Sequence, residues 1–475
     1  MQCISTDCTV LTISQVPTLV HDTLPREIYN MSADSSSSSS QGLLRVLGLV
    51  TGLAVTFGGI VGLGILRAPG EIASQLPDPW WYMSVWVIAG LFALLGTASA
   101  AEMATSLPRA GAYYAYAHRA FGPFVGFVSG WTDWLNWCGA TAVTIIVIIE
   151  YLHLLTPAVS SENIPLAAAI AVAFALVQWR GVRWGSGVHN ATSIIKSLIF
   201  AALIIACFII GGGAAMPEAA AETPQMPGGW TLIMAFVVAL RGVIYAYDGW
   251  VFTAYFSEEM KDPGRMIPRA MFGGVWIVIT VYLLINIALL RMLPMSEIAG
   301  AELAVGKAIE SVFGAMAETF ITAMLTGFML IGLNLGYMPA SRVVYAMSCE
   351  GLFFANCKTV NKGGTPTIAL AASVVATLVF LFFSSTFAKL MEVLAFFTVV
   401  NYVILFLAVF TMRQREPDLP RPYKTWGHPW TTGIALIGGI AFLIGTIISG
   451  TTTGLYALVL VAVSSPVYVL FRRGK

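Results

Sequence analysis

The residues best suited to binding a small molecule lie in two glycine-interrupted stretches of long apolar segments. The first stretch has four glycines within seven residues, from Gly58 to Gly64, and is followed by Pro69. Each glycine in a helix interior costs about 1 kcal/mol relative to alanine, and proline opens or kinks a helix. We therefore predict two half-helices joined by unwound backbone at Gly62–Gly64.

The second stretch places an acidic residue in the middle of an apolar segment, where Asp248 stands beside Gly249 and follows Tyr245. A charge at the centre of a membrane span costs about 3 kcal/mol or more, so it requires a reason. Glycine that allows close helix packing would explain either stretch alone. Two such stretches, opening corresponding segments of two halves, instead indicate broken helices around a binding site.

Broken helices expose backbone groups that bind charged ligands. A half-helix N-terminus presents free N–H groups and a partial positive charge, which suit a carboxylate. A half-helix C-terminus presents free carbonyl groups, which suit an ammonium group. Unwound backbone within lipid is tolerated only where it lines a cavity. Together these groups fit the two ends of an α-amino acid.

The elements that must position these groups are membrane helices. Apolar residues make up 57% of the chain and charged residues 10%, whereas soluble domains average about 45–50% and about 25%. The mean hydropathy is +0.81, and a helix needs roughly 20 apolar residues to cross the hydrocarbon. Twelve segments are expected to span: 43–76, 80–105, 121–153, 163–179, 190–212, 231–258, 268–292, 308–340, 366–384, 387–411, 430–449 and 452–471.

The remaining composition excludes several classes of protein. The net charge of +1 argues against nucleic-acid binding, and the six cysteines form no C-x-x-C pair. Because the cysteines are scattered, no disulfide framework is predicted. The histidines do not cluster with cysteines or acids at metal-ligand spacing, so no metal site is predicted either, and no cofactor is expected. The sequence also shows no nucleophile–base pair that would face either membrane surface, so an enzyme is not predicted.

The basic residues predict the orientation and the domain organisation. With both termini in the cytoplasm, most Lys and Arg residues fall in cytoplasmic connections, as the positive-inside rule requires. We predict a disordered cytoplasmic tail over 1–41, which ends in six serines. A first inverted repeat is expected over 42–212, a second over 231–411, and two further helices with a short cytoplasmic tail over 430–475.

Several stretches resemble the amino acid–polyamine–cation superfamily, in particular its L-type amino acid transporter branch and the bacterial relatives of that branch. The resemblance extends over roughly 42–430, and its segments come in family order. It rests on these stretches: Gly62-Leu63-Gly64-Ile65, Ala100–Met103, Pro108–Tyr114, Tyr245–Trp250, Ser257–Pro263, Ile267–Ala270, Asn334–Arg342 with Tyr345, and Arg421–Lys424.

The resemblance implies a LeuT-like five-plus-five inverted repeat with broken helices one and six and two extra C-terminal helices. It implies a carboxylate on the N–H groups of Leu63 and Gly64, with Tyr245 and Trp250 as gates. Leu63 departs from the serine of the family, which removes a hydroxyl contact but not backbone binding. The substrate-binding set that it implies is Ile60, Gly62, Leu63, Gly64, Ile65, Tyr245, Ala246, Asp248 and Asn334, with the carbonyl groups of Ile60 and Tyr245 toward the ammonium.

Lys196 lies inside the fifth segment, about 9 Å from its start at 1.5 Å per residue. One interpretation is that its side chain snorkels to the cytoplasmic face. The other rests on the resemblance, because some relatives hold a lysine where sodium-driven relatives hold sodium. We favour this second interpretation, in which Lys196 links segments one and eight, replaces the ion and could carry a coupling proton. It predicts sodium-independent transport.

The other buried charges leave alternatives open. Asp248 either attracts the substrate ammonium or hydrogen-bonds the frayed helix ends, and Arg241, seven residues earlier, could neutralise it. Asp133 is expected to be a polar anchor among aromatic residues. Three charged residues are predicted near the cytoplasmic helix ends: Glu102, Glu258 and Arg342. They form either an inner gate of ion pairs or part of a solvated surface.

The expected function is sodium-independent transport of neutral amino acids by alternating access, as an exchanger or a proton symporter. A cationic amino acid or polyamine transporter is the alternative that Asp248 motivates, and a nutrient sensor without net transport is another. The loop at 153–163 lacks the cysteine with which some relatives join a partner, so no disulfide-linked accessory subunit is expected. The predicted pocket walls are Cys138, Gly139, Met329, Phe396, Phe397 and Asn401.

Overall fold

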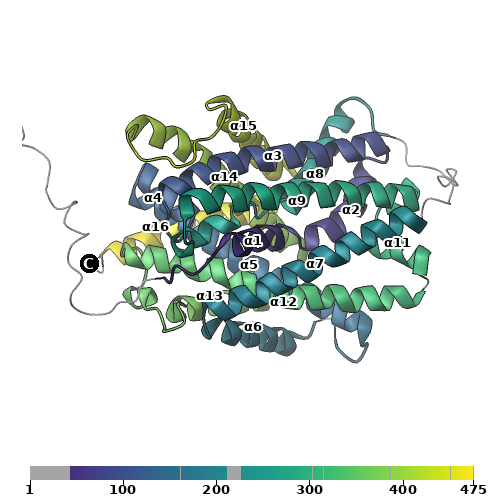
Figure 1. Cartoon of the computed structure of the whole chain (residues 1–475), viewed down its shortest axis with the longest axis horizontal. Helices are drawn as coiled ribbons and strands as arrows, with labels where there is room; N and C mark the ends of the chain where they lie inside the picture. The colour runs from purple at the N-terminus through teal and green to yellow at the C-terminus, as the bar shows by residue number, and fades with distance from the viewer. Residues whose placement is uncertain are drawn as a thin grey trace, which may run out of the picture. The chain divides into compact units, whose positions relative to one another are not determined.

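Helices form every extended regular element in the part of the chain that the structure, a computed structural model, describes. That part comprises residues 43–160, 162–210, 226–301, 303–313, 315–383, 387–449 and 451–473. The predicted tail over 1–41 lies outside the described residues. The helices run beside one another in a bundle (Figure 1), and the beginning of α1 and the end of α16 lie at the same end of it.

The first half of the bundle begins with a helix that is broken in two. The chain leaves α1 at Val61, whose backbone is extended, and restarts as α2 after Gly62. The helices of this half are α1 Leu49–Ile60, α2 Leu63–Gln75, α3 Pro79–Ser106, α4 Tyr113–Phe121, α5 Pro123–Leu155, α6 Ile164–Trp179 and α7 Val182–Ile210.

A second broken helix follows later in the chain, with a different kind of break; the inverted repeat stays a prediction. Helix α8 ends at Ala246, five residues form turns, and the chain continues as the 3-10 helix η3. The elements are α8 Gly229–Ala246, η3 Phe252–Glu259, α9 Pro263–Met292, α10 Met295–Ile298, α11 Ala304–Phe313, α12 Ala315–Cys349, η4 Ala355–Lys358, α13 Thr367–Phe383 and α14 Phe387–Arg415, followed by α15 Trp430–Ser449 and α16 Thr451–Arg473.

Both predicted breaks are present, and the first differs in detail from the prediction. We expected unwound backbone from Gly62 to Gly64, but helical geometry resumes at Leu63, so Gly64 lies in the first turn of α2. Pro69 does not open the second half-helix but lies inside it, so of the two predicted roles only the kink remains. Glycine tolerates the extended bend, and one non-helical residue pair is enough to end one helix and start another.

Seven helices in the described part are long and apolar enough to cross a membrane. Four shorter apolar helices accompany them, beginning at Ile164, Thr367, Trp430 and Leu458. The chain is therefore a multi-pass membrane protein. The count of twelve spans and the cytoplasmic position of the termini stay predictions.

The two broken helices sit at the centre of the packing. Helix α2 packs on α8, α1 packs on α7 and α9, and α5 packs on α12. The Oγ1 atoms of Thr56 in α1 and Thr253 in η3 lie 2.7 Å apart, and Thr253 also donates to the carbonyl of Gly52 at 3.0 Å. The two breaks are thus held next to each other by buried hydrogen bonds.

Candidate functional site

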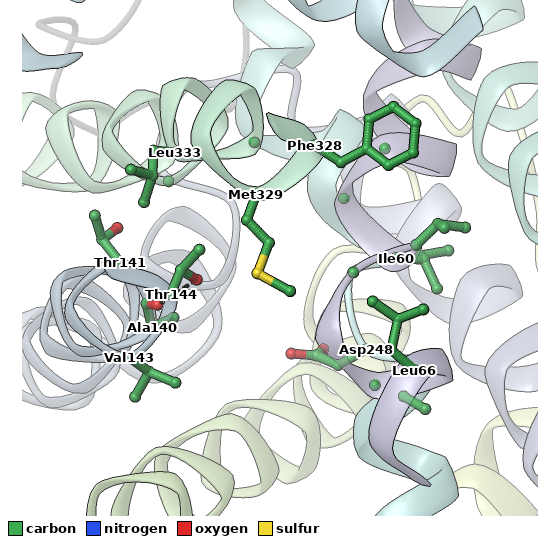
Figure 2. A pocket seen from close by; sticks show the side chains of 18 of the residues that line it. Ile60, Leu66, Ala140, Thr141, Val143, Thr144, Asp248, Phe328, Met329 and Leu333 are labelled. Atoms are coloured by element: carbon green, nitrogen blue, oxygen red, sulfur yellow. Dashed lines mark hydrogen bonds between the residues drawn. The ribbon is translucent and has the colours of Figure 1, made fainter. Parts of the chain in front are cut away.

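A cavity lies where the two breaks meet, between α1, α2, α5, α7, α8 and α12. Its volume is about 190 Å³, whereas one water needs about 10–15 Å³, so it holds a molecule of amino-acid size. Figure 2 shows Met329 reaching into it from α12 and the Asp248 carboxylate pointing into it from the second break. The lining is mostly apolar, with backbone groups and a few polar side chains, as in small-molecule sites.

The N-terminus of α2 opens onto this cavity. Gly62, its N-cap, provides no side chain to satisfy the first N–H groups, and the first four N–H groups of a helix lack partners within the helix. A side chain added at Gly62 would meet nothing within 4 Å, whereas one at Gly64 would lie 2.5 Å from the Cα atom of Ala246. The space above Gly62 is therefore open, and glycine at position 64 lets α2 approach α8.

The carbonyl groups at the ends of α1 and α8 share one hydroxyl group. Tyr282 of α9 lies 3.0 Å from the carbonyl oxygens of both Ile60 and Ala246. The carbonyl of Tyr245 accepts the N–H of Asp248 at 3.1 Å. Each carbonyl oxygen has two lone pairs, so the oxygens of Ile60 and Ala246 each keep one acceptor position beside the Tyr282 hydroxyl group.

Asp248 takes its hydrogen bonds from neighbours that the spacing did not indicate. The Tyr402 hydroxyl of α14 donates to Oδ1 of Asp248, and the Gly249 N–H donates to the same atom at 2.8 Å. The partnership with Arg241 that helical spacing suggested is therefore not what satisfies this carboxylate. Oδ1 holds the end of the break in place, and the rest of the carboxylate faces the cavity.

Lys196 lies on the cavity wall rather than at the membrane surface. Its ammonium group donates to the carbonyl of Val61, in the first break, at 3.3 Å, and the side chain is 7% exposed. On the other side it faces Gly332 of α12, where an added Cβ atom would lie 3.8 Å from Nζ. A fixed positive charge thus stands between α1 and α12, the first and eighth predicted segments.

The cavity brings together most of the predicted site residues. Ile60, Gly62, Gly64, Ala246 and Asp248 line it, as do Tyr245 and Lys196. Ile65 is fully buried and does not line it, and Trp250 instead packs on Tyr402 and Phe406 with its ring centroid 4.8 Å from that of Tyr402. The side chains of Leu63 and Asn334 lie outside the described residues.

The walls were predicted on the wrong face of the third segment. Cys138 and Gly139 of α5 point away from the cavity, as Gly139 faces Leu394 and Cys138 is buried. Met329 lines the cavity as expected, whereas Phe396, Phe397 and Asn401 do not. The wall that α5 provides consists of Asn136, Trp137, Ala140, Thr141, Val143 and Thr144.

Two of the three charges near these helix ends form ion pairs, with partners other than those proposed. Arg342 binds Glu259 at 2.8 Å, both side chains being 1% exposed or less. Glu102 is buried and binds Arg413 at 2.6 Å and Arg421 at 3.3 Å. A solvated surface is therefore the wrong interpretation for Arg342 and Glu102. Glu258 instead accepts the N–H of Ala110 at 3.0 Å.

Asp133 is anchored by a tyrosine. The Tyr255 hydroxyl of η3 lies 2.7 Å from one of its carboxylate oxygens and 2.9 Å from the other. Sequence reasoning missed Tyr255, Tyr282 and Tyr402 as partners. Their one signal is that tyrosine carries a hydroxyl group into an apolar segment, where it requires a partner.

A bundle of membrane helices with two broken helices facing one central cavity defines a membrane transport protein. A similar fold is found in a solved structure, that of Mhp1, a nucleobase-cation-symport-1 family transporter, in a closed conformation with bromovinylhydantoin bound. The match has a TM-score of 0.50 and 16% identity, and covers 89% of this chain and 94% of that one. The chain belongs to the amino acid permease family, whose model matches residues 47–470.

Known relatives are amino acid transporters. The serine/threonine exchanger SteT of Bacillus subtilis is 28% identical over 443 residues, which cover 92% of this chain and 99% of the relative. The large neutral amino acids transporter small subunit 2 of Mus musculus is 28% identical, covering 82% and 74%. The b(0,+)-type amino acid transporter 1 of Oryctolagus cuniculus is 26% identical, covering 83% and 81%. The chain is accordingly a transporter and not an enzyme.

Proposed function

We propose that this protein carries neutral amino acids across the cytoplasmic membrane by alternating access, without sodium, as an exchanger or a proton symporter. The observation that carries the proposal is the uncapped N-terminus of α2, which opens onto a largely apolar cavity beside the carbonyl groups of the α1 and α8 ends. The N–H groups bind the carboxylate, and the carbonyl groups of Ile60 and Tyr245 bind the ammonium. Tyr245 closes the site as a gate.

The side-chain space favours a neutral substrate. Leu66, Phe328, Met329 and Leu333 provide apolar contacts around the cavity. The names of two relatives, a serine/threonine exchanger and a large neutral amino acids transporter, agree with a substrate of this class. We assign Trp250 to support of the second break, because it packs on α14 rather than facing the ligand.

Lys196 supplies the positive charge that makes sodium unnecessary. Its ammonium group donates to the Val61 carbonyl and faces Gly332 of α12, so a positive charge stands beside the first break without a bound cation. In this proposal Lys196 keeps the first break in the substrate-binding shape. The loop at 153–163 contains no cysteine, and we propose that the protein works without a disulfide-linked accessory subunit.

Asp248 favours a second candidate, transport of cationic amino acids or polyamines, because its carboxylate faces the cavity. Purified protein in proteoliposomes separates the candidates: uptake of labelled L-serine and L-leucine is measured with arginine and putrescine as competitors. We expect competition by neutral amino acids alone and no loss when choline replaces sodium. Uptake that collapses in choline contradicts sodium independence, strong competition by arginine favours the second candidate, and binding without accumulation indicates a sensor.

A further inference from the structure

A second, smaller cavity lies on the other side of Asp248. It is lined by Asp133 of α5, by Asp248 of the second break, by Tyr255 of η3 and by Thr398 of α14. Its volume is about 20 Å³, and one water needs about 10–15 Å³, so it holds a single group of water size. Asp248 lines both cavities, so this small cavity adjoins the substrate site.

Both carboxylates receive neutral hydrogen-bond donors rather than a counter-charge. The two oxygens of Asp133 share the one hydroxyl group of Tyr255, at 2.7 and 2.9 Å. Asp248 accepts from Tyr402 and from the Gly249 N–H. Neither carboxylate forms a salt bridge within the described ranges. Since one hydroxyl group has one proton to donate, acceptor positions remain on both groups.

Thr398 points independently to an occupant of this cavity. Its side chain is 7% exposed, and its hydroxyl group has no hydrogen-bond partner. A buried hydroxyl group left unpaired costs about 1–3 kcal/mol. A water molecule or a carboxyl group turned toward the cavity would give this hydroxyl group a partner.

No positively charged side chain lines this small cavity among the described residues. The titratable groups that face the cavity besides the two carboxylates are Tyr113 of α4 and Tyr255, and with Tyr402 they carry no charge near neutral pH. The positively charged Lys196 faces the larger cavity, where it binds the Val61 carbonyl. Two carboxylates that line one poorly solvated cavity cannot both ionise cheaply, so a proton on one of them is favoured.

We propose that Asp133 and Asp248 form a proton-binding dyad that couples proton movement to the substrate cavity. One carboxylate takes up a proton from the aqueous phase on one side, becomes a carboxylic acid, and releases the proton to the other side; no other bond forms or breaks. Because Asp248 lines both cavities, its protonation changes the charge that faces the bound substrate. This inference rests on the proposed function and deepens it, by selecting proton symport over exchange.

Infrared difference spectroscopy tests the dyad without any substrate. Protein in lipid nanodiscs is stepped between about pH 8 and about pH 5, and the carbonyl stretch of protonated carboxyl groups is recorded. We expect a band in the wild type that disappears in Asp133→Asn and in Asp248→Asn and persists in Glu150→Gln, whose side chain pairs with Arg67. A wild-type protein without a titrating band, or a band unchanged in both Asp variants, overturns the proposal.

Uptake of labelled L-serine into proteoliposomes tests the coupling. One coupled proton and an inward gradient of about one pH unit support accumulation of about tenfold, which corresponds to about 1.4 kcal/mol. We expect Asp133→Asn to bring this ratio to about one and Glu150→Gln to keep it. An Asp133→Asn protein that still accumulates serine overturns the proposal. If the infrared band is present but no amino acid is taken up, the proposed substrate class fails and the proton site stands.

Discussion

The buried pair of Arg342 and Glu259 allows a sharp prediction about stability. Arg342 of α12 donates to Glu259 through two nitrogen atoms, at 2.8 and 3.3 Å, and lies over the ring of Phe256 at 5.4 Å from its centroid. The side chains are 1% and 0% exposed. The pair therefore fixes the end of η3 to α12 at a place that water does not reach.

Removing one partner leaves the other charge buried and uncompensated, which costs about 3–5 kcal/mol. We expect Glu259→Gln to destabilise the protein by this amount. The exposed pair of Arg109 and Glu350, with side chains 71% and 42% exposed, is the matched control. Glu350→Gln should cost about 0–1 kcal/mol, because solvent screens such a pair.

The assay is reversible unfolding of the detergent-solubilised protein, followed by thermal melting and by denaturant titration. The double variant Glu259→Gln with Arg342→Met should be less destabilised than the sum of the two single variants, because no isolated charge remains. A Glu259→Gln protein within about 1 kcal/mol of the wild type, or strictly additive single variants, would refute the reasoning, since the pair would then be solvated or not formed.

Three further predictions concern the breaks and the loop between α14 and α15. Gly64→Ala forces α2 away from Ala246, so the free energy of unfolding should fall by about 1–3 kcal/mol and the thermal shift caused by L-serine should disappear. The control is Gly62→Ala, where the added methyl group has open space and the melting temperature should stay nearly unchanged. Lys196→Met removes the fixed charge at the first break, so initial uptake of L-serine should fall at least about tenfold, equivalent to about 1.4 kcal/mol; unchanged uptake would remove Lys196 from the mechanism. Burial lowers the pKa of His428, outside the spans. Its neutral form is therefore favoured in the folded state, so stability should decrease by less than about 1 kcal/mol as the pH falls from about 7 to about 5. Melting curves of His428→Asn, recorded over the same pH range, should lack this decrease.

The breaks could be predicted from the sequence because glycine and proline act locally. Four glycines in about two turns weaken a helix whatever surrounds it, and an aspartate in an apolar segment needs polar neighbours. The restart at Leu63 could not be predicted, because it depends on how closely Gly64 approaches Ala246 across two helices. That distance is a tertiary property, which local propensity does not contain.

The walls and the ion pairs depend on helical phase, which the sequence does not state. The α5 residues that line the cavity, such as Asn136, Ala140, Val143 and Thr144, follow the helical spacing of one face. Cys138 and Gly139 lie on another face, although they are neighbours in sequence. In the same way, Glu259 rather than Glu258 meets Arg342, because one residue of register decides which of two adjacent acids points inward.

The hydroxyl group of Tyr282 makes the two helix breaks mechanically dependent on each other. It lies 3.0 Å from the carbonyl oxygens of Ile60 and Ala246, and it has one proton to share between them. Any motion that draws α1 away from α8 leaves at least one of these helix ends without its donor. Although the two breaks lie far apart in the sequence, they should therefore move together as one rigid body during transport. The helices that shift relative to each other should be those around the two breaks, and α1 and α8 should keep their relative position.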